Sequence, residues 1–512
     1  MESDIEFLKV RRRRLPAECS ADYLLPDYLG EVKRVLFANA TVDDLTTYEG
    51  DEDLGVGGSV LIKVVYLDTE DKLSHLDFTA DVDSSVKWDK EMTESVSVEC
   101  EVEKLSLRLM GPRKFSAKVQ LTLGVEESVL TAHSVEGDGM EGNEPECDTV
   151  RIRVAEFSKY TCEDITLNEE LSFLEGAIED EVSVLVYDMS VADATTEDKG
   201  VISGNLLCRA LVKVGEEYPT VMTKTVPFEG IIRDYTSDGE ILTQTIIDIR
   251  DTFVKTVGSD DGVRIEMGCR LQPKLLCHGN RECELVKDCY LKEYESRAEY
   301  GSLDYVCVDN GESGRVDLEL SIDAEELGIG NIREVIYSSL EVKGEDISAD
   351  GKTLAIVGKI RASGIACVIN EENLPSYCAL KCDMPFKANV NYNCHNSGNS
   401  ELDCSLALCD ASLYTDGGKL CMSGNLLYSA LSSVQKSQEV LTALFRSEEQ
   451  IHREESVVTV YYPTSGESLF SVAKTFHTSV LKLAKDNSIT EEVFADKSGS
   501  LLGHGVRRLI VK

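Results

Sequence analysis

The sequence predicts a mainly β protein, in which tandem β-rich, sandwich-like repeat domains are followed by a small α+β domain of β-α-α-β order. Apolar and polar residues alternate in runs such as 96–102 and 263–271, which is typical of strands with one buried face. Clusters of Asp, Gly and Ser separate these runs at short intervals, as turns separate strands. In the body of the chain only residues 430–455 have the spacing of a longer helix.

Internal repetition predicts the tandem arrangement. Residues 203–214 read SGNLLCRALVKV and residues 423–434 read SGNLLYSALSSV, so eight of the twelve positions are identical. Looser copies of the same run begin at Gly58 and Gly358. We therefore expect three copies, each with a second half that resembles its first half. The copies are expected at roughly 26–125, 176–275 and 331–435.

A second mark, a phenylalanine after an acidic residue or a proline, lies downstream of three of these runs. The three steps are Asp77-Phe78, Pro227-Phe228 and Pro385-Phe386. Proline cannot donate a hydrogen bond to a neighbouring strand, so we expect the step to end the pairing and to insert one aromatic ring into the core. The first copy departs from the pattern because Asp77 stands where the others have proline.

Composition between the copies sets the expected domain boundaries. Residues 126–147 are acidic and glycine-rich and form the best linker candidate, and residues 446–455 resemble a solvated tether. We expect three β-rich domains, a tether and a final small domain. Their expected ranges are 1–145, 146–290 and 291–447 for the β-rich domains, 448–457 for the tether and 458–512 for the final domain.

The final domain has a clear order of elements. Residues 458–462 and 509–511 are its two expected strands. Ser468 is placed to cap a first helix and Ser479 a second, which Asn487 is expected to end. In the first helix, apolar residues recur at i, i+3, i+4 and i+7. They are Leu469, Val472, Ala473 and Phe476.

A net charge of −41 is the strongest compositional fact. A surface so acidic repels phosphate backbones, so we do not expect a nucleic-acid partner. Residues 458–512 hold seven bases and five acids, a net charge of +2, which leaves −43 for residues 1–457. Either the final domain seeks an anionic partner surface, or small domains simply vary in charge.

Targeting signals and cysteines bear on the compartment. No apolar run approaches the roughly 18 residues of a membrane span. Residues 1–5 carry acids where a signal peptide has bases, and no apolar segment follows, so we expect a cytosolic protein. The 17 cysteines are odd in number and show no paired spacing, so we expect reduced thiols and no disulfide framework.

Motifs for chemistry are scarce, so we expect no enzyme, no cofactor and no metal site. The cluster Gly55–Gly58 is followed by a β-run, which favours a hairpin turn over a phosphate-binding loop. The densest Cys/His regions fit buried thiols better than zinc spacing. They are Cys277-His278, Cys283 and Cys289, and Cys378, Cys382 and Cys394-His395. The basic run Arg11–Arg14 either neutralises neighbouring acids or clasps an anionic partner.

The β-α-α-β order of residues 458–512, with Gly466-Glu467-Ser468-Leu469 before the first helix and Asp486-Asn487 after the second, resembles the LysM domain. This resemblance implies ligand contacts from the loops on either side of the helix pair. The implied contacts are Gly466, Glu467, Ser468 and Leu469, and Asn487, Ser488, Ile489 and Thr490. Phe470, which we also expect to be a contact, stands where an indole is common, and the loop 488–506 is long, so we expect a protein ligand more than a glycan.

Three β-rich units followed by such a domain resemble the SipL family of spore-coat morphogenetic proteins, whose repeated unit is the SPOCS domain. Gly111-Pro112-Arg113-Lys114-Phe115 and Val226-Pro227-Phe228-Glu229 resemble parts of that unit. The resemblance implies a non-enzymatic scaffold in the mother-cell cytoplasm, at the forespore surface and spore coat. It further implies that the LysM domain docks a coat basement-layer ATPase (SpoIVA-like), together with other coat morphogenetic proteins.

Two other functional classes stay open at this point. A peptidoglycan-binding cell-wall protein, recognising N-acetylglucosamine glycan, would use the same LysM loops but would have to be exported. An enzyme would need a nucleophile, a base and an orienting group brought together, and no such combination is evident in the sequence.

Overall fold

The computed structural model describes residues 5–50, 53–88, 93–138, 144–197, 200–233, 235, 239–329, 332–369, 375–393, 400–451, 458–490 and 499–512. Within these ranges the chain is mainly β, as the sequence predicts, and its sheets are almost entirely antiparallel. Two short α-helices lie near the C-terminus. Among the helices of this described part, none has the length and apolar character needed to cross a membrane.

The first unit contains six strands in two sheets, of order β1-β6-β5 and β2-β3-β4. The strands are β1 (Ile5–Leu24), β2 (Val32–Glu49), β3 (Asp53–Asp68), β4 (Leu73–Lys87), β5 (Thr93–Gly111) and β6 (Lys114–His133). Alternate residues of the two central strands, such as Ile62 on β3 and Val119 on β6, meet in one buried cluster. The unit is therefore a β-sandwich.

The second unit repeats this plan, with sheets β10-β11-β12 and β13-β14-β8, and β9 also pairs with β14. The strands are β8 (Glu146–Thr161), β9 (Ile165–Glu175), β10 (Val182–Thr196), β11 (Val201–Val214), β12 (Thr220–Ile231), β13 (Glu240–Ser259) and β14 (Gly262–Tyr290). A single 3₁₀ turn, η1 (Glu179–Glu181), joins β9 to β10.

The third unit has sheets β16-β17-β18 and β15-β20-β19. Its elements are β15 (Tyr294–Asp323), η2 (Ala324–Leu327), β16 (Ile332–Ala349), β17 (Thr353–Ile369), β18 (Pro375–Asn391), β19 (Ser400–Asp416) and β20 (Lys419–Gln450). The short strand β7 (Glu136–Asp138) pairs in parallel with β20. In all three units the last long strand pairs antiparallel with the first, which closes each sandwich.

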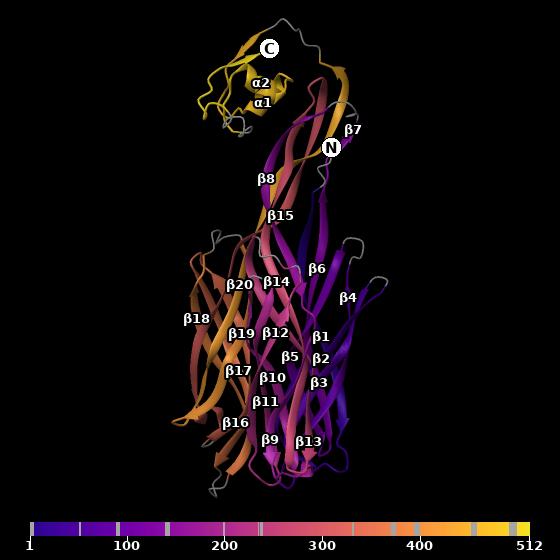
Figure 1. Cartoon of the computed structure of the whole chain (residues 1–512), viewed down its shortest axis with the longest axis vertical. Coiled ribbons are helices and arrows are strands. Elements are labelled where there is room, and N and C mark those ends of the chain that lie inside the picture. Colours follow the sequence, from indigo (N-terminus) through magenta and orange to yellow (C-terminus); the bar gives the residue numbers. More distant parts are fainter. Residues whose placement is uncertain are drawn as a thin grey trace.

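A central apolar cluster joins the three units side by side (Figure 1). The equivalent strands β2, β10 and β16 each contribute two consecutive buried residues, so the contact has three-fold pseudosymmetry. The six residues are Leu36-Phe37, Leu185-Val186 and Ile336-Tyr337. The rings of Phe37 and Tyr337 meet edge to face with centroids 5.4 Å apart. Burial of this cluster holds the units in one elongated body.

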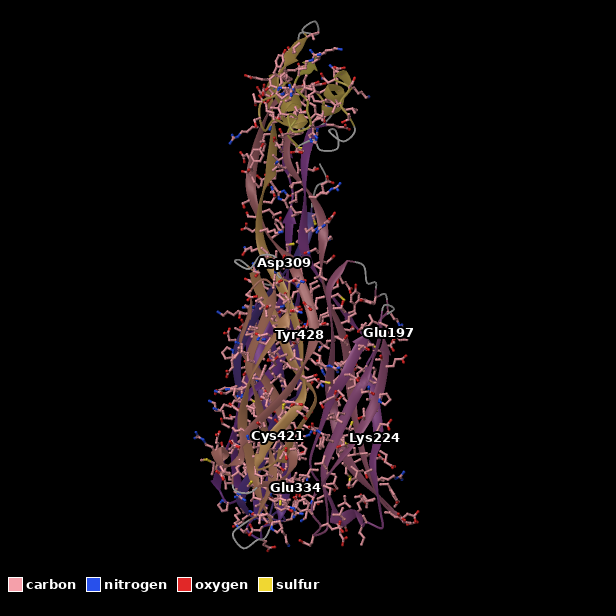
Figure 2. The ribbon with its side chains drawn as sticks, turned by 90° about the vertical axis from the view of Figure 1, so that its left-hand side faces the viewer. Glu197, Lys224, Asp309, Glu334, Cys421 and Tyr428 are labelled. Atoms are coloured by element: carbon pink, nitrogen blue, oxygen red, sulfur yellow. A yellow bond between two sulfur atoms is a disulfide. The ribbon has the colours of Figure 1, made fainter. Side chains whose placement is uncertain are left out.

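Four strands continue beyond the body and form a stalk: β8, β14, β15 and β20 (Figure 1). β15 and β20 pair along almost their whole length, from Tyr294 opposite Gln450 to Asp323 opposite Lys419. Asp309 marks the level at which β15 leaves the body (Figure 2). The two strand pairs β8–β14 and β15–β20 bury apolar residues between them, including Leu285 and Val440. The body thus carries a projecting two-layer support.

The opposite end of the molecule is formed by turns, and we call it the basal end. Among the described residues it consists of the turns 25–31, 69–72, 111–113, 176–181, 215–219, 260–261, 324–329 and 417–418. Leu24 lies opposite Lys114 there, and Glu175 lies opposite Gly262. Glu334, at the start of β16, lies near this end (Figure 2).

Three local predictions are wrong. The expected helix at 430–455 is instead the second half of β20. The expected hairpin turn at Gly55–Gly58 lies inside β3, where a Cβ on Gly58 would come 2.2 Å from the backbone oxygen of Asp44. The glycine is required by that close approach of the neighbouring strand and does not mark a turn.

The third of these predictions is that the proline–phenylalanine steps end pairing. The rings are buried as expected, with Phe78, Phe228 and Phe386 in the three cores. However, β12 and β18 continue in register through the prolines, and Phe228 lies opposite Gly204. β12 and β18 are edge strands, where a missing N–H donor can face solvent.

The expected linker and tether are partly strand. Residues 126–133 belong to β6, and residues 448–450 belong to β20. The remainder of the expected linker includes β7, while residues 139–143 and 452–457 lie outside the described ranges. The chain therefore passes from the body to its C-terminal part along the stalk.

Candidate functional site

The last part of the chain forms a small domain at the tip of the stalk, which we call the terminal module (residues 458–512). It contains β21 (Thr459–Tyr461), α1 (Leu469–Thr475), α2 (Val480–Asp486) and β22 (Leu509–Val511). β21 and β22 pair antiparallel, and the helices lie between them in the chain. Ser468 caps α1 in a reciprocal capping box with Ser471, and Ser479 caps α2, so both predicted caps are confirmed.

The first predicted contact loop is held by Glu467. Its carboxylate accepts a hydrogen bond from the Tyr461 hydroxyl and another from the Thr464 backbone N–H, each at 2.6 Å. The Tyr461 hydrogen bond is the main reason that the pKa of Glu467 is lowered. Gly466, beside it, has φ +90°, a conformation that favours glycine, and is exposed. Glu467 therefore shapes the loop, while Gly466 presents its backbone to solvent.

The second predicted contact loop is held by Asn487. Its amide donates to the backbone oxygens of Leu483 at 2.9 Å and Ile510 at 2.8 Å, and its carbonyl accepts from the Ile510 N–H. These bonds join the end of α2 to β22. Ser488 follows with φ +53° and is exposed, as is Thr490. The loop thus offers Ser488 and Thr490 to an external ligand.

The remaining predicted contact residues lie in the core of the module. Leu469 is fully buried, Ser468 is buried as a cap, and Ile489 is half-buried against the same cluster. Phe470, predicted as a contact, is 3% exposed. Its buried ring packs within the molecule and is not available to an external ligand. Among the predicted contact residues, the exposed ones are Gly466, Ser488 and Thr490.

Tyr290, the last residue of β14, is a functional residue that the sequence did not reveal. It belongs to the core of the terminal module and is 1% exposed. Its ring meets that of Phe470 edge to face, with centroids 5.3 Å apart, and its hydroxyl donates to the backbone oxygen of Thr478 at 2.6 Å. The stalk therefore completes the core of the module. A lone aromatic at a strand end carries no local signal for such a contact.

Polar contacts surround Tyr290 and fix the module on the stalk. The Lys474 ammonium donates to both carboxylate oxygens of Asp288 at 2.7 Å, and the Tyr300 hydroxyl donates to the same carboxylate. On the other side, Nδ1 of His477 lies 3.3 Å from the Leu291 backbone oxygen. These polar contacts, together with the buried ring of Tyr290, hold the module in one orientation on the stalk.

A disulfide lies directly beneath the module. Cys147 on β8 and Cys289 on β14 occupy opposed positions in the strand pair and are bonded to each other. The expectation that all thiols are reduced is therefore wrong for this pair, because strand register brings together two cysteines far apart in the sequence. Of the cysteines in the described ranges, the other fourteen are free thiols.

In the other predicted Cys/His regions, the cysteines that the structure describes apart from Cys289 are free thiols. Cys277 and Cys283 are free and buried on β14, and burial raises the pKa of Cys277 to about 12. Cys382 is buried on β18 and Cys378 is half-buried there. Cys394-His395 lies outside the described residues. In the described part of the chain, no three His, Cys, Asp or Glu residues form a group that could hold a metal ion.

The basic run Arg11–Arg14 lies beside a cavity of about 790 Å³ that all three units line. Arg12 pairs with Glu126 at 2.9 Å and with Asp403 of the third unit at 2.5 Å, and Arg13 pairs with Glu127. For these two residues the contacts match the interpretation that the run neutralises neighbouring acids. His278 also lines this cavity, and burial together with nearby Arg12 lowers its pKa to about 4.

A buried lysine lies at the junction of the first two units. Lys63 on β3 is 7% exposed, and its ammonium lies 3.1 Å from the ring centroid of Tyr187 and donates to the Tyr187 backbone oxygen. Burial lowers the pKa of Lys63 to about 8, although the nearby carboxylates of Asp77, Asp188 and Asp43 oppose the shift. This contact places a buried charged group at the junction, beside the carboxylates of both units.

Asp188 makes the matching polar contact with the third unit. It pairs with Arg209 on the neighbouring strand at 2.7 Å and accepts a hydrogen bond from the Tyr337 hydroxyl at 3.0 Å.

No known protein family, curated protein or solved structure matches this chain.

Proposed function

We propose that the protein is a non-enzymatic scaffold whose terminal module docks a protein partner. The observation that carries the proposal is the position of the module, which the buried contacts of Tyr290 hold at the tip of a stalk. A module fixed in this way presents exposed Gly466 and Thr490 at a distance from the acidic body. Such a layout supports placement of a partner at a defined distance from the body.

The partner that we propose is the coat basement-layer ATPase (SpoIVA-like), with other coat morphogenetic proteins joining the assembly. The proposal follows the resemblance to the SipL family and its SPOCS and LysM domains, and it locates the protein in the mother-cell cytoplasm at the forespore surface. The net charge of +2 in residues 458–512 supports binding to an acidic surface, while the body at −43 would be repelled from one.

The test uses the full chain, because Tyr290 belongs to the core of the module. The purified chain is immobilised, and the purified ATPase is passed over it in biolayer interferometry. Thr490→Arg adds a bulky charge in the second contact loop and is expected to weaken binding at least tenfold. Thr220→Arg, at an exposed threonine on β12, is the matched control and is expected to bind like the unchanged chain.

Absence of binding by the unchanged chain, or equal weakening by both variants, would overturn the proposal. Sedimentation with purified peptidoglycan sacculi separates the glycan-binding alternative. The glycan-binding alternative is supported if the unchanged chain is retained on sacculi, Thr490→Arg abolishes this retention, and the chain does not bind the ATPase. The same loops would then bind N-acetylglucosamine glycan.

A further inference from the structure

The most exposed apolar side chains lie at the two ends of the molecule. Six large apolar residues in the described ranges are at least 60% exposed. Four lie at or beside turns of the basal end and two in the terminal module. They are Leu24, Tyr28, Met110 and Ile178 at the basal end, and Val458 and Tyr462 in the module. Exposed apolar residues gathered at particular places are a common mark of interaction surfaces.

In the module these residues belong to one face of the β21–β22 sheet, which we call the outer sheet face. In β21 and the residues on either side of it, exposed Val458, Val460 and Tyr462 alternate with half-buried Thr459 and Tyr461. In β22 and the residues on either side of it, exposed Arg508, Ile510 and Lys512 alternate with buried Leu509 and Val511. Val460 lies directly opposite Ile510. The outer sheet face thus has apolar side chains along one strand. Along the other strand it has an apolar side chain between two basic ones.

The basal end has the opposite charge. The turn 176–181 and the other turns of this end together carry thirteen exposed carboxylates against two bases, Lys72 and Arg113. Ile178 lies within the first of these turns and is 61% exposed. Apolar side chains surrounded by acids at one end therefore complement apolar side chains flanked by bases at the other.

We propose that copies of this chain associate head to tail, with the outer sheet face of one copy bound to the basal end of the next. Contact between two basal ends would oppose carboxylates to carboxylates, and contact between two outer sheet faces would oppose bases to bases. Only the head-to-tail contact pairs apolar with apolar and basic with acidic. The two surfaces differ, so the contact is heterologous and leaves a free surface at each end of every assembly.

The size of the surface sets the expected strength. A two-stranded face with four apolar side chains is small for a specific interface, so the dissociation constant is expected on the order of 10 μM. The contact loops for the proposed partner lie outside this face. Self-association and partner docking can therefore occur on the same module.

The first measurement is sedimentation velocity of the full chain at concentrations on either side of about 10 μM. The weight-average mass is expected to rise beyond that of a dimer without reaching a plateau, because a heterologous contact adds copies one after another. A chain that stays monomeric throughout, or that stops at a dimer, overturns the proposal.

The second measurement blocks one surface at a time. Val460→Glu with Arg508→Glu blocks the outer sheet face, and Tyr28→Glu with Met110→Glu blocks the basal end. All four side chains are exposed, so the fold is expected to persist, which circular dichroism checks. Each blocked variant alone is expected to be monomeric, and an equimolar mixture is expected to form dimers and nothing larger.

This mixing outcome is specific to a head-to-tail contact. If copies met through two identical surfaces, one of the blocked variants would still form dimers alone, and that result overturns the proposal. Ile231→Glu is the matched control, because this residue is 59% exposed and lies between the two ends. It is expected to associate like the unchanged chain, and loss of association in this control would also overturn the proposal.

Discussion

The ring of Tyr290 lies edge to face against the ring of Phe470, although one belongs to the stalk and the other to α1 of the terminal module. Neither ring is more than 3% exposed. The module is thus built around a residue supplied by β14, and its stability depends on the stalk.

Tyr290→Ala tests this dependence. Removal of a fully buried aromatic ring is expected to destabilise the module by about 3–4 kcal/mol, because the lost contacts leave a cavity. Tyr290→Phe keeps the ring and loses only the hydrogen bond to the Thr478 oxygen, so a loss of about 1 kcal/mol is expected. Hydrogen exchange of the α1 and α2 amides in the full chain measures both values.

Tyr414→Ala is the control for these two variants, since Tyr414 is 46% exposed on β19 and does not belong to the module. Protection of α1 and α2 should be unchanged in this control. Equal protection in Tyr290→Ala and in the unchanged chain would show that the module does not need the tyrosine.

The disulfide between Cys147 and Cys289 is expected to stabilise the stalk. A reductant should lower the free energy of unfolding of the oxidised chain by about 2–4 kcal/mol, because the cross-link restricts the unfolded chain. The double variant Cys147→Ser/Cys289→Ser should not respond to the reductant. Urea unfolding, followed by circular dichroism with and without reductant, measures the difference.

Cys283→Ser, at a buried free thiol on the same strand, should retain the response to reductant. Thiol titration of the unfolded chain provides an independent check. If all 17 cysteines react before any reductant is added, the pair is not bonded in the purified protein.

Lys63 makes stability depend on pH. Its pKa is about 8 in the folded chain and about 10.4 in an unfolded one. Between these values the unfolded chain binds the extra proton, so the free energy of unfolding rises with pH. The contribution of Lys63 to that rise is on the order of 3 kcal/mol. Below pH 8 the lysine is charged in both states and its contribution is constant.

Lys63→Met removes this titration. The stability of the variant relative to the unchanged chain should therefore be greater at pH 7 than at pH 10.5. Urea unfolding at both values measures the change, and Lys72→Met, at an exposed lysine between β3 and β4, is the control. A difference between Lys63→Met and the unchanged chain that is equal at the two pH values would contradict a lowered pKa.

Much of the architecture could be predicted from local patterns. Alternation along strands indicated the β body, and the capping residues Ser468 and Ser479 marked both helices of the module. The twin runs at 203–214 and 423–434 are the central strands of two sheets, β11 and β20, which explains why they resemble each other. A central strand is buried along one face and paired on both edges, so similar side chains suit both positions.

The predictions are wrong where contacts between residues distant in the sequence override the local spacing of apolar residues. Val440, Leu441 and Leu444 have helical spacing, yet all three are buried on β20. A register shift opposite Tyr300 interrupts the alternation, and the stalk packs on both faces of the strand there. Tyr290 and the Cys147–Cys289 pair were missed for the same reason, since only the assembled stalk brings their partners near.

Each sandwich closes with its last strand paired to its first, and this has a consequence for synthesis on the ribosome. β15 emerges long before β20, the strand with which it pairs along the stalk in the described part of the chain. At about 5–20 residues per second, the interval is on the order of ten seconds. During that time the exposed strand edge can pair wrongly, and the same holds for β1 and β8, whose partners β6 and β14 follow after similar lengths of chain. Tyr290 remains without its packing partners for longer still, until the last residues of the module have been synthesised.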